Sequence, residues 1–128
     1  MKRYISDAPN APAAIGPYSQ AVTANGFAYL SGQIPLNPET GALVGPTIEA
    51  QTEQVMKNIA AVLHHLGLQF TDLVKTTIFL TDLGHFQTVN GIYEKALGAV
   101  KPARSTVQVA ALPKGANVEI EVIALLRG

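Results

Sequence analysis

Two segments near the end of the chain, residues 102–109 and 118–126, alternate between polar and apolar side chains. A period of two is typical of a β-strand, whose side chains point alternately to its two faces. The turn-like residues 112–117 lie between the two segments. We therefore predict that the segments are antiparallel neighbours joined by a hairpin.

The polar positions of these two strands bring charged side chains together. If the apolar faces coincide, Arg104 lies on the same side of the sheet as Glu119 and Glu121. A cation and two acids on a sheet face are costly to bury unless they are paired or bind a ligand. We therefore expect this face to carry the function.

Shorter apolar runs predict further strands, at residues 3–5, 18–23, 27–33 and 74–80. Asn25-Gly26, between the second and third of these, is the strongest short signal for a hairpin because both residues tolerate a positive φ. Gly32 lies near the end of a predicted strand. Such a glycine marks either a bulge or strand end, or a place where another backbone or a ligand approaches closely, and its spacing alone favours neither.

Apolar side chains at steps of three and four residues predict two amphipathic helices. The first runs from Ile48 to Leu66, with Thr47 placed to cap its start and Gly67 its end. The stripe of the second consists of Phe86, Val89, Tyr93 and Leu97. Asn90 lies beside this stripe, where a polar side chain usually bonds a neighbouring backbone, so the residues alone favour a structural role for it.

The predicted order of elements is therefore β-β-β-α-β-α-β-β. Helical crossovers favour parallel pairing and hairpins favour antiparallel pairing, so the sheet is predicted to be mixed. Two helices can cover only one of its faces. The other face is predicted to carry Arg104, Thr106, Gln108, Glu119, Glu121, Ile123 and Leu125. Because this face is half apolar and half ionic, we expect it to be closed by self-association.

The composition fits a single α+β domain over residues 1–128, with 48% hydrophobic residues for one aliphatic core. Nine basic and nine acidic residues cancel and are scattered, unlike the clusters of a nucleic-acid or membrane-surface binder. The sequence has no cysteine, which excludes disulfides and thiol chemistry. Its apolar runs are too short for a signal peptide or a membrane span, so a cytoplasmic protein is expected.

The sequence contains none of the Walker-type, GxGxxG, HExxH or GxSxG motifs. What remains is Arg104 with the two carboxylates, near Ser31-Gly32 and Tyr18. Arginine grips a carboxylate through two parallel hydrogen bonds, and an enclosed glutamate can orient or deprotonate water. This set suits hydrolysis of a small anionic substrate. An ion pair between subunits, without chemistry, explains it equally well.

Six different short motifs occur in order along nearly the whole chain: Gly16-Pro17-Tyr18-Ser19-Gln20, Leu30-Ser31-Gly32-Gln33-Ile34-Pro35, Val74-Lys75-Thr76-Thr77-Ile78-Phe79-Leu80, Val89-Asn90 with Tyr93, Pro102-Ala103-Arg104-Ser105 and Val118-Glu119-Ile120-Glu121. In these motifs the chain resembles the reactive intermediate deaminase A family (RidA, or YjgF-type). The resemblance implies a chorismate-mutase-like α+β fold, with two helices on one face of a mixed sheet. It also implies a homotrimer that turns the other sheet face inward, with sites in the clefts between subunits.

The activity that this resemblance implies is hydrolysis of reactive enamine or imine acids, such as 2-aminoacrylate, to 2-keto acids and ammonia. It requires neither a metal nor an organic cofactor. Carried over by motif, Arg104 would hold the substrate carboxylate and Glu119 would position the attacking water. The backbone of Gly32 and Thr106 would contact the substrate, while the pocket would be shaped by Tyr18, Ser31 and Asn90.

The chain departs from the family pattern at two places. It has Thr106 where many members have cysteine, and Lys101, in a short loop, where an aromatic residue is common. Two alternatives to an imine deaminase remain. One is a non-catalytic protein that binds 2-keto acids. The other is a ribonuclease or translation inhibitor, which the scattered charge disfavours because phosphate contacts need concentrated Lys and Arg.

Overall fold

The computed structural model describes residues 1–127. Its elements are β1 (Arg3–Ile5), β2 (Ala21–Ala24), β3 (Phe27–Gln33), α1 (Ile48–His65), β4 (Leu73–Leu80), α2 (Phe86–Leu97), β5 (Ala103–Gln108) and β6 (Val118–Leu125). Short 3-10 turns η1, η2 and η3 occupy Phe70–Asp72, Leu83–His85 and Pro113–Gly115. The predicted order of strands and helices is confirmed. No helix within residues 1–127 is long and apolar enough to cross a membrane.

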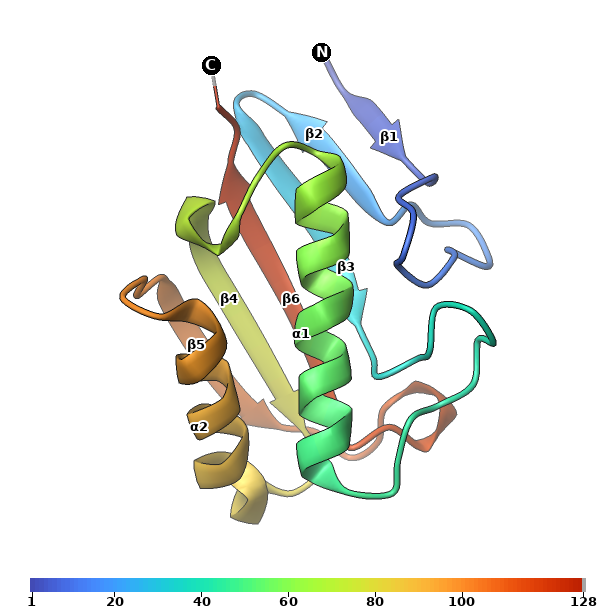
Figure 1. Ribbon diagram of the computed structural model, residues 1–128, viewed down its shortest axis with the longest axis vertical. Helices are drawn as coiled ribbons and strands as arrows, with labels where there is room; N and C mark the ends of the chain where they lie inside the picture. Colours follow the sequence, from blue (N-terminus) through green and yellow to red (C-terminus); the bar gives the residue numbers. More distant parts are fainter. Residues whose placement is uncertain (128) are drawn as a thin grey trace.

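The strands form one six-stranded sheet in the order β1-β2-β3-β6-β4-β5. Only β4 and β5 are parallel, and the other neighbouring pairs are antiparallel. Both helices lie against the same face of this sheet (Figure 1). The mixed α+β sheet with two helices on one face is therefore confirmed.

Local signals in the sequence account for the ends of the elements. The Thr47 side chain accepts a hydrogen bond from the backbone of Ala50 and so caps α1. Asn25 and Gly26 join β2 to β3 with φ angles of 52° and 86°, the left-handed conformation that a two-residue hairpin requires. Both predictions are confirmed.

The predicted hairpin between the last two strands is wrong, because β4 lies between β5 and β6. Thr76 of β4 pairs with Arg104 on one side and with Val122 on the other. The α2 crossover returns the chain parallel to β4, which leaves β5 at the edge of the sheet. Residues 109–117 then carry the chain past β4 to its other side.

This strand order also overturns the predicted faces. Residues in register on adjacent strands point to the same face of a sheet. Arg104 is level with Thr76, which is fully buried beneath the helices, so Arg104 faces the helices. Glu119 is level with Phe79 and points to the opposite face. Arg104 and the glutamates are therefore on opposite faces of the sheet. This follows because β5 and β6 each pair with β4, and β4 decides which of their residues share a face.

The core lies between the helices and the sheet. Its fully buried side chains come from α1, β4, α2 and β6 and include Ile59, Leu63, Ile78, Leu80, Val89 and Ile120. Each such side chain stabilises the fold by roughly 1.5–3 kcal/mol relative to an exposed one. The helices are thereby fixed on the sheet, and α2 is held above β5.

We call the uncovered side of the sheet the open face. Its side chains are Phe27, Tyr29, Lys75, Thr77, Phe79, Ser105, Val107, Glu119, Glu121, Ile123 and Leu125. Glu119, Glu121, Ile123 and Leu125 lie there as predicted, whereas Arg104, Thr106 and Gln108 do not. The open face exposes large apolar groups, including Tyr29 at 45% and Leu125 at 49% of their surface.

Candidate active site

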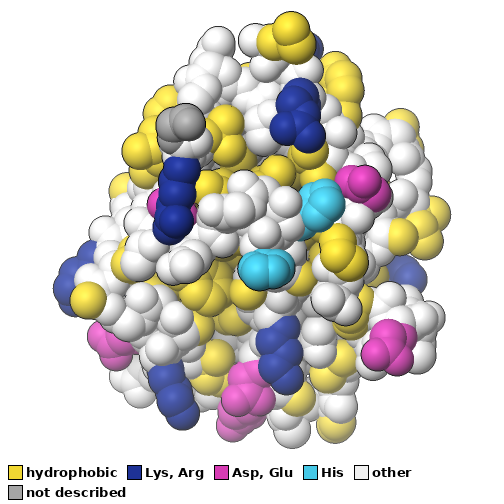
Figure 2. Space-filling model, turned by 45° about the horizontal axis from the view of Figure 1, so that its top comes forward, with side chains coloured by type: hydrophobic (Ala, Val, Ile, Leu, Met, Phe, Trp, Pro, Cys, Tyr) yellow, Lys and Arg dark blue, Asp and Glu magenta, His cyan; other side chains and the backbone are white. Residues whose placement is uncertain are grey.

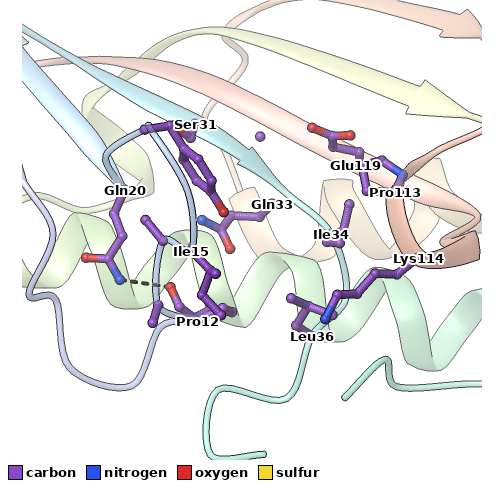
Figure 3. A pocket seen from close by; sticks show the side chains of 14 residues that line it. Pro12, Ile15, Gln20, Ser31, Gln33, Ile34, Leu36, Pro113, Lys114 and Glu119 are labelled. Carbon is purple, nitrogen blue, oxygen red and sulfur yellow. Dashed lines mark hydrogen bonds between the residues drawn. The ribbon is translucent and has the colours of Figure 1, made fainter. Parts of the chain in front are cut away.

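A pocket of about 530 Å³ opens where β3 ends (Figure 3). Its walls come from the N-terminal segment, from the end of β3, from η3 and from the start of β6. Four of the predicted site residues line it: Tyr18, Ser31, Gly32 and Glu119. The apolar Ile15 and Ile34 and the cationic Lys114 line it as well.

Gly32 lies in a bulge at the mouth of this pocket. Leu30 pairs with Val122 and Gln33 pairs with Ile120, so β3 has one residue more than β6 over this stretch. A Cβ at residue 32 would overlap a carboxylate oxygen of Glu119 and would lie 2.9 Å from its carboxyl carbon. Of the two roles that the sequence left open for Gly32, the bulge is confirmed, and the group that approaches this glycine closely here is the Glu119 side chain. The bulge and the missing side chain together make room for Glu119.

Hydrogen bonds hold the N-terminal segment over the pocket. The Ser31 hydroxyl donates to the Ser19 carbonyl at 2.6 Å. The buried Gln20 side chain accepts from the backbone of Ala8 at 2.8 Å and donates to the Pro12 carbonyl at 2.9 Å (Figure 3). Because the Ser31 hydroxyl donates its hydrogen bond to the Ser19 carbonyl, Ser31 shapes the pocket by anchoring this segment.

Glu119 is the acidic residue among those that line the pocket. Its burial raises the pKa of its carboxyl group, and the neighbouring charge of Glu121 on the same face raises that pKa further. Within residues 1–127 no Lys, Arg or His nitrogen lies within 4.0 Å of its carboxylate. A half-buried, unpaired carboxylate with a raised pKa is a stronger base than an ordinary glutamate and is suited to accept a proton from water.

Arg104 lies in a second hollow, of about 380 Å³, beside α2 and edge strand β5. Its Nη1 donates to Asn90 Oδ1 at 2.5 Å. Its guanidinium carbon lies 5.5 Å from the ring centre of Phe86 and 5.2 Å from that of Tyr93. Asn90 thus bonds the Arg104 side chain, whereas the residues alone favoured a neighbouring backbone as its partner.

Thr106 is level with the buried Ile78 and faces the helices. Its hydroxyl oxygen is buried and has no hydrogen-bond partner among the described residues. The Thr106 side chain therefore lies on the Arg104 side of the sheet, away from Glu119.

The predicted site residues thus form two groups. Tyr18, Ser31, Gly32 and Glu119 share the pocket at β3, and Asn90, Arg104 and Thr106 lie near the β5 edge. β5 and β6 are separated by β4, which at a strand spacing of about 4.8 Å puts their backbones roughly 10 Å apart. The two groups also face opposite sides. One small ligand cannot touch Arg104 and Glu119 of the same copy.

Some residues of these hollows were not predicted. Phe86 and Tyr93 were assigned to the core stripe, yet both rings also contact Arg104. Their spacing with Asn90, at steps of four and three, is a signal that one helix face carries all three. Lys114 comes from a turn, and nothing local in the sequence indicates that it reaches the pocket. Within residues 1–127 no three His, Asp or Glu side chains are grouped to hold a metal ion.

Comparison with known proteins agrees with this architecture. The family model described as Endoribonuclease L-PSP matches residues 8–126. Reactive Intermediate Deaminase A, chloroplastic, from Arabidopsis thaliana is 52% identical over 126 residues, which is 98% of this chain and 67% of that protein. The 2-iminobutanoate/2-iminopropanoate deaminase of Homo sapiens is 46% identical, over 98% of this chain and 90% of the human protein.

A solved structure is similar over the full fold. Escherichia coli TdcF with bound serine superposes with a TM-score of 0.90 at 39% identity, covering 98% of this chain and 100% of TdcF. The chain therefore belongs to the Endoribonuclease L-PSP family and, within it, to the RidA or YjgF-type proteins that its motifs indicated.

Proposed function

We propose that this protein hydrolyses reactive 2-imino acids, and their 2-enamino tautomers such as 2-aminoacrylate, to 2-keto acids and ammonia. The observation that carries the proposal is Glu119, a half-buried carboxylate with a raised pKa that lines a pocket beside Gly32. The names of the Arabidopsis and human relatives support an imine deaminase role in general. The choice of 2-iminobutanoate or 2-iminopropanoate as substrate is part of the proposal.

The proposed reaction begins when Glu119 accepts a proton from a water molecule as its oxygen attacks C2 of the imine. The C=N bond becomes a single bond as Glu119 passes this proton to the nitrogen, giving a carbinolamine. Glu119 then accepts the hydroxyl proton of the carbinolamine and delivers it to the nitrogen, so that the C=O bond forms as the C–N bond breaks. One water is consumed, and one 2-keto acid and one ammonia leave. An imine carbon is already electrophilic, so the site mainly orients the reactants.

In the proposed complex the substrate carboxylate is held by Arg104 from a second copy of the chain. Two observations support this arrangement. Arg104 and Glu119 of one copy lie on opposite faces of the sheet, and the open face exposes apolar side chains that a partner copy would cover. Three copies arranged in a ring would bury the open faces and give three equivalent sites. The proposed assembly is therefore a homotrimer with intersubunit sites.

A second candidate is a protein that binds 2-keto acids or other small carboxylates without turnover. The observation in its favour is the serine bound to TdcF, a relative that shares the fold. Binding would use Arg104 and Asn90, and only Glu119 is specific to hydrolysis. The two functions therefore differ at one residue.

The test is to generate 2-iminobutanoate in situ with a threonine dehydratase and to let semicarbazide compete for the free imine. We expect the wild type to protect the imine by converting it to 2-oxobutanoate, and Glu119→Gln and Arg104→Ala to lose this protection. Arg104→Lys should lose this protection as well, because the lysine ammonium cannot reproduce the two parallel hydrogen bonds of a planar guanidinium. If neither the wild type nor any variant accelerates formation of 2-oxobutanoate while the protein still binds it, the chain is a carboxylate-binding protein. Cleavage of a single-stranded RNA by the wild type would instead support a nuclease.

A further inference from the structure

The orientation of Arg104 is set by one face of α2. Phe86, Asn90 and Tyr93 follow one another at steps of four and three residues, so they project from the same side of the helix toward β5. The guanidinium carbon lies within 6 Å of both ring centres, the range of a cation–π contact. Arg104 is otherwise exposed, and an arginine without such contacts would sample many rotamers.

Tyr93 differs from Phe86 because its ring is anchored. Its phenol oxygen lies 2.7 Å from Thr76 Oγ1. Tyr93 is 6% exposed and Thr76 is fully buried. Thr76 is also the in-register neighbour of Arg104 on β4. One hydrogen bond thus ties the ring that contacts the guanidinium to the strand beside Arg104.

Arg104 is held in place without being neutralised. Asn90 accepts one N–H of the guanidinium, which has five such donors. Within residues 1–127 no carboxylate oxygen lies within 4.0 Å of the Arg104 nitrogens. The guanidinium is therefore oriented by neutral groups and keeps its charge and its remaining donors for an external anion.

We propose that Tyr93 is a positioning residue for Arg104, and that its hydrogen bond to Thr76 holds the ring so that the guanidinium keeps the orientation in which it receives a substrate carboxylate. This inference rests on the proposed function, because it takes the carboxylate of a 2-imino acid as the anion. A guanidinium released from this contact would have to be ordered by the ligand. The cost would appear in ligand affinity and in KM rather than in kcat.

The test compares variants that remove the ring, the hydroxyl or the anchor, with Kd for 2-oxobutanoate and with kcat and KM for 2-iminobutanoate as readouts. We expect Tyr93→Leu to weaken binding by about tenfold, the scale of a lost cation–π contact. Tyr93→Phe and Thr76→Val should each weaken it by about threefold. Their double variant should be no worse than either single one, since both delete the same bond. In all of them kcat should change little.

Tyr4→Phe is the matched control, because Tyr4 is a tyrosine 67% exposed on edge strand β1. It should leave Kd and KM unchanged. Where Tyr93→Leu fails to fold, the Tyr93→Phe and Thr76→Val pair carries the test, since the double variant leaves no buried hydroxyl unpaired.

The decisive measurement is made in the Arg104→Ala background. If Tyr93 acts through Arg104, Tyr93→Leu should not weaken the residual binding of 2-oxobutanoate any further there. An equal loss in both backgrounds would overturn the inference and make Tyr93 a purely structural residue. Unchanged affinity in every Tyr93 and Thr76 variant, with weakened binding in Arg104→Ala, would overturn the inference alone. Unchanged affinity in Arg104→Ala itself would overturn the proposed function.

Discussion

A Cβ on Gly32 would overlap a carboxylate oxygen of Glu119, the acidic residue that lines the pocket. This contact lies where β3 has one residue more than β6, between Leu30 and Gln33. The Glu119 carboxylate can therefore occupy this position only because residue 32, on the neighbouring strand β3, has no side chain.

Replacing Gly32 with alanine should displace the Glu119 carboxylate, because the obstructing atom is the free end of a flexible side chain. We expect the protein to fold and kcat for 2-iminobutanoate to fall by about tenfold to a hundredfold, the usual result of misplacing a catalytic group by 1 Å. Gly91→Ala is the control, since a Cβ there meets nothing within 4 Å on α2. It should stabilise the fold by roughly 1 kcal/mol and leave kcat unchanged. Equal kcat in both variants would contradict the proposed role of Glu119.

Glu119→Gln should remove activity and raise the melting temperature near pH 8. The folded state raises the pKa of Glu119, so its stability contribution is full below the unfolded value of about 4.3 and is lost as pH rises through the folded pKa. Glutamine does not ionise, so the variant keeps this stability as the pH rises. Thermal melts of both proteins at pH 4 and pH 8 test this, with the difference expected only at pH 8. A variant that melts below the wild type at pH 8 would show that ionised Glu119 stabilises the fold.

The pH dependence of the reaction follows from the same group. A general base must be ionised, so kcat should fall as the medium is acidified through the raised pKa of Glu119. The midpoint of this acid limb should lie above that of an ordinary glutamate. It is measured from kcat between pH 4 and pH 9, with the dehydratase in excess at each pH. An acid limb at the ordinary glutamate value would be inconsistent with a buried base.

Mixed assemblies test whether Arg104 and Glu119 act across two copies. Arg104→Ala and Glu119→Gln should each be inactive alone. After they are refolded together, about a quarter of the sites in random rings would combine an intact Arg104 with an intact Glu119. We expect activity to return to that level. As a control, Arg104→Ala mixed with the double variant should stay inactive.

Recovery in the first mixture but not in the second would place the two residues in different copies. If native mass spectrometry finds mixed assemblies and activity does not return, the proposed intersubunit site is wrong. The same spectra give the number of copies, expected to be three chains of 13.5 kDa each.

The end of β6 is tied to η1 by a two-point ion pair. Arg127 Nε and Nη2 lie 3.1 and 3.0 Å from the two carboxylate oxygens of Asp72. The Arg127 hydrogen bond, followed by that of the Gln69 backbone, lowers the pKa of Asp72. Its stabilisation is therefore present above the unfolded pKa of about 3.9 and is lost as pH falls through the folded value.

Arg127→Ala should lower the free energy of unfolding by less than about 1 kcal/mol at pH 7, because the arginine is half exposed and solvent screens the pair. Urea denaturation at pH 7 and at acid pH measures the difference, which should shrink in acid. Lys2→Ala is a control for loss of an exposed cation at the other end of the chain. An equal effect in both variants would mean that only net charge matters.

Local chemistry made most elements predictable. Thr47 caps α1 because its hydroxyl satisfies a free backbone N–H, and Asn25-Gly26 turns because both residues accept a positive φ. The alternation in residues 118–126 placed Glu119 and Glu121 together on the open face. The family motifs also named Arg104 and Glu119, and their joint role remains a prediction.

The tertiary structure decided which strands are neighbours. Alternation determines which residues of one strand share a face, but it carries no information about the phase between strands. That phase depends on long-range pairing, and here the α2 crossover makes β4 rather than β6 the neighbour of β5. This choice puts Arg104 beneath α2, beside Tyr93, and leaves Glu119 on the open face. Local patterns and motifs were enough to predict the elements and to indicate the candidate site residues, and only packing divided those residues between two sides of the sheet.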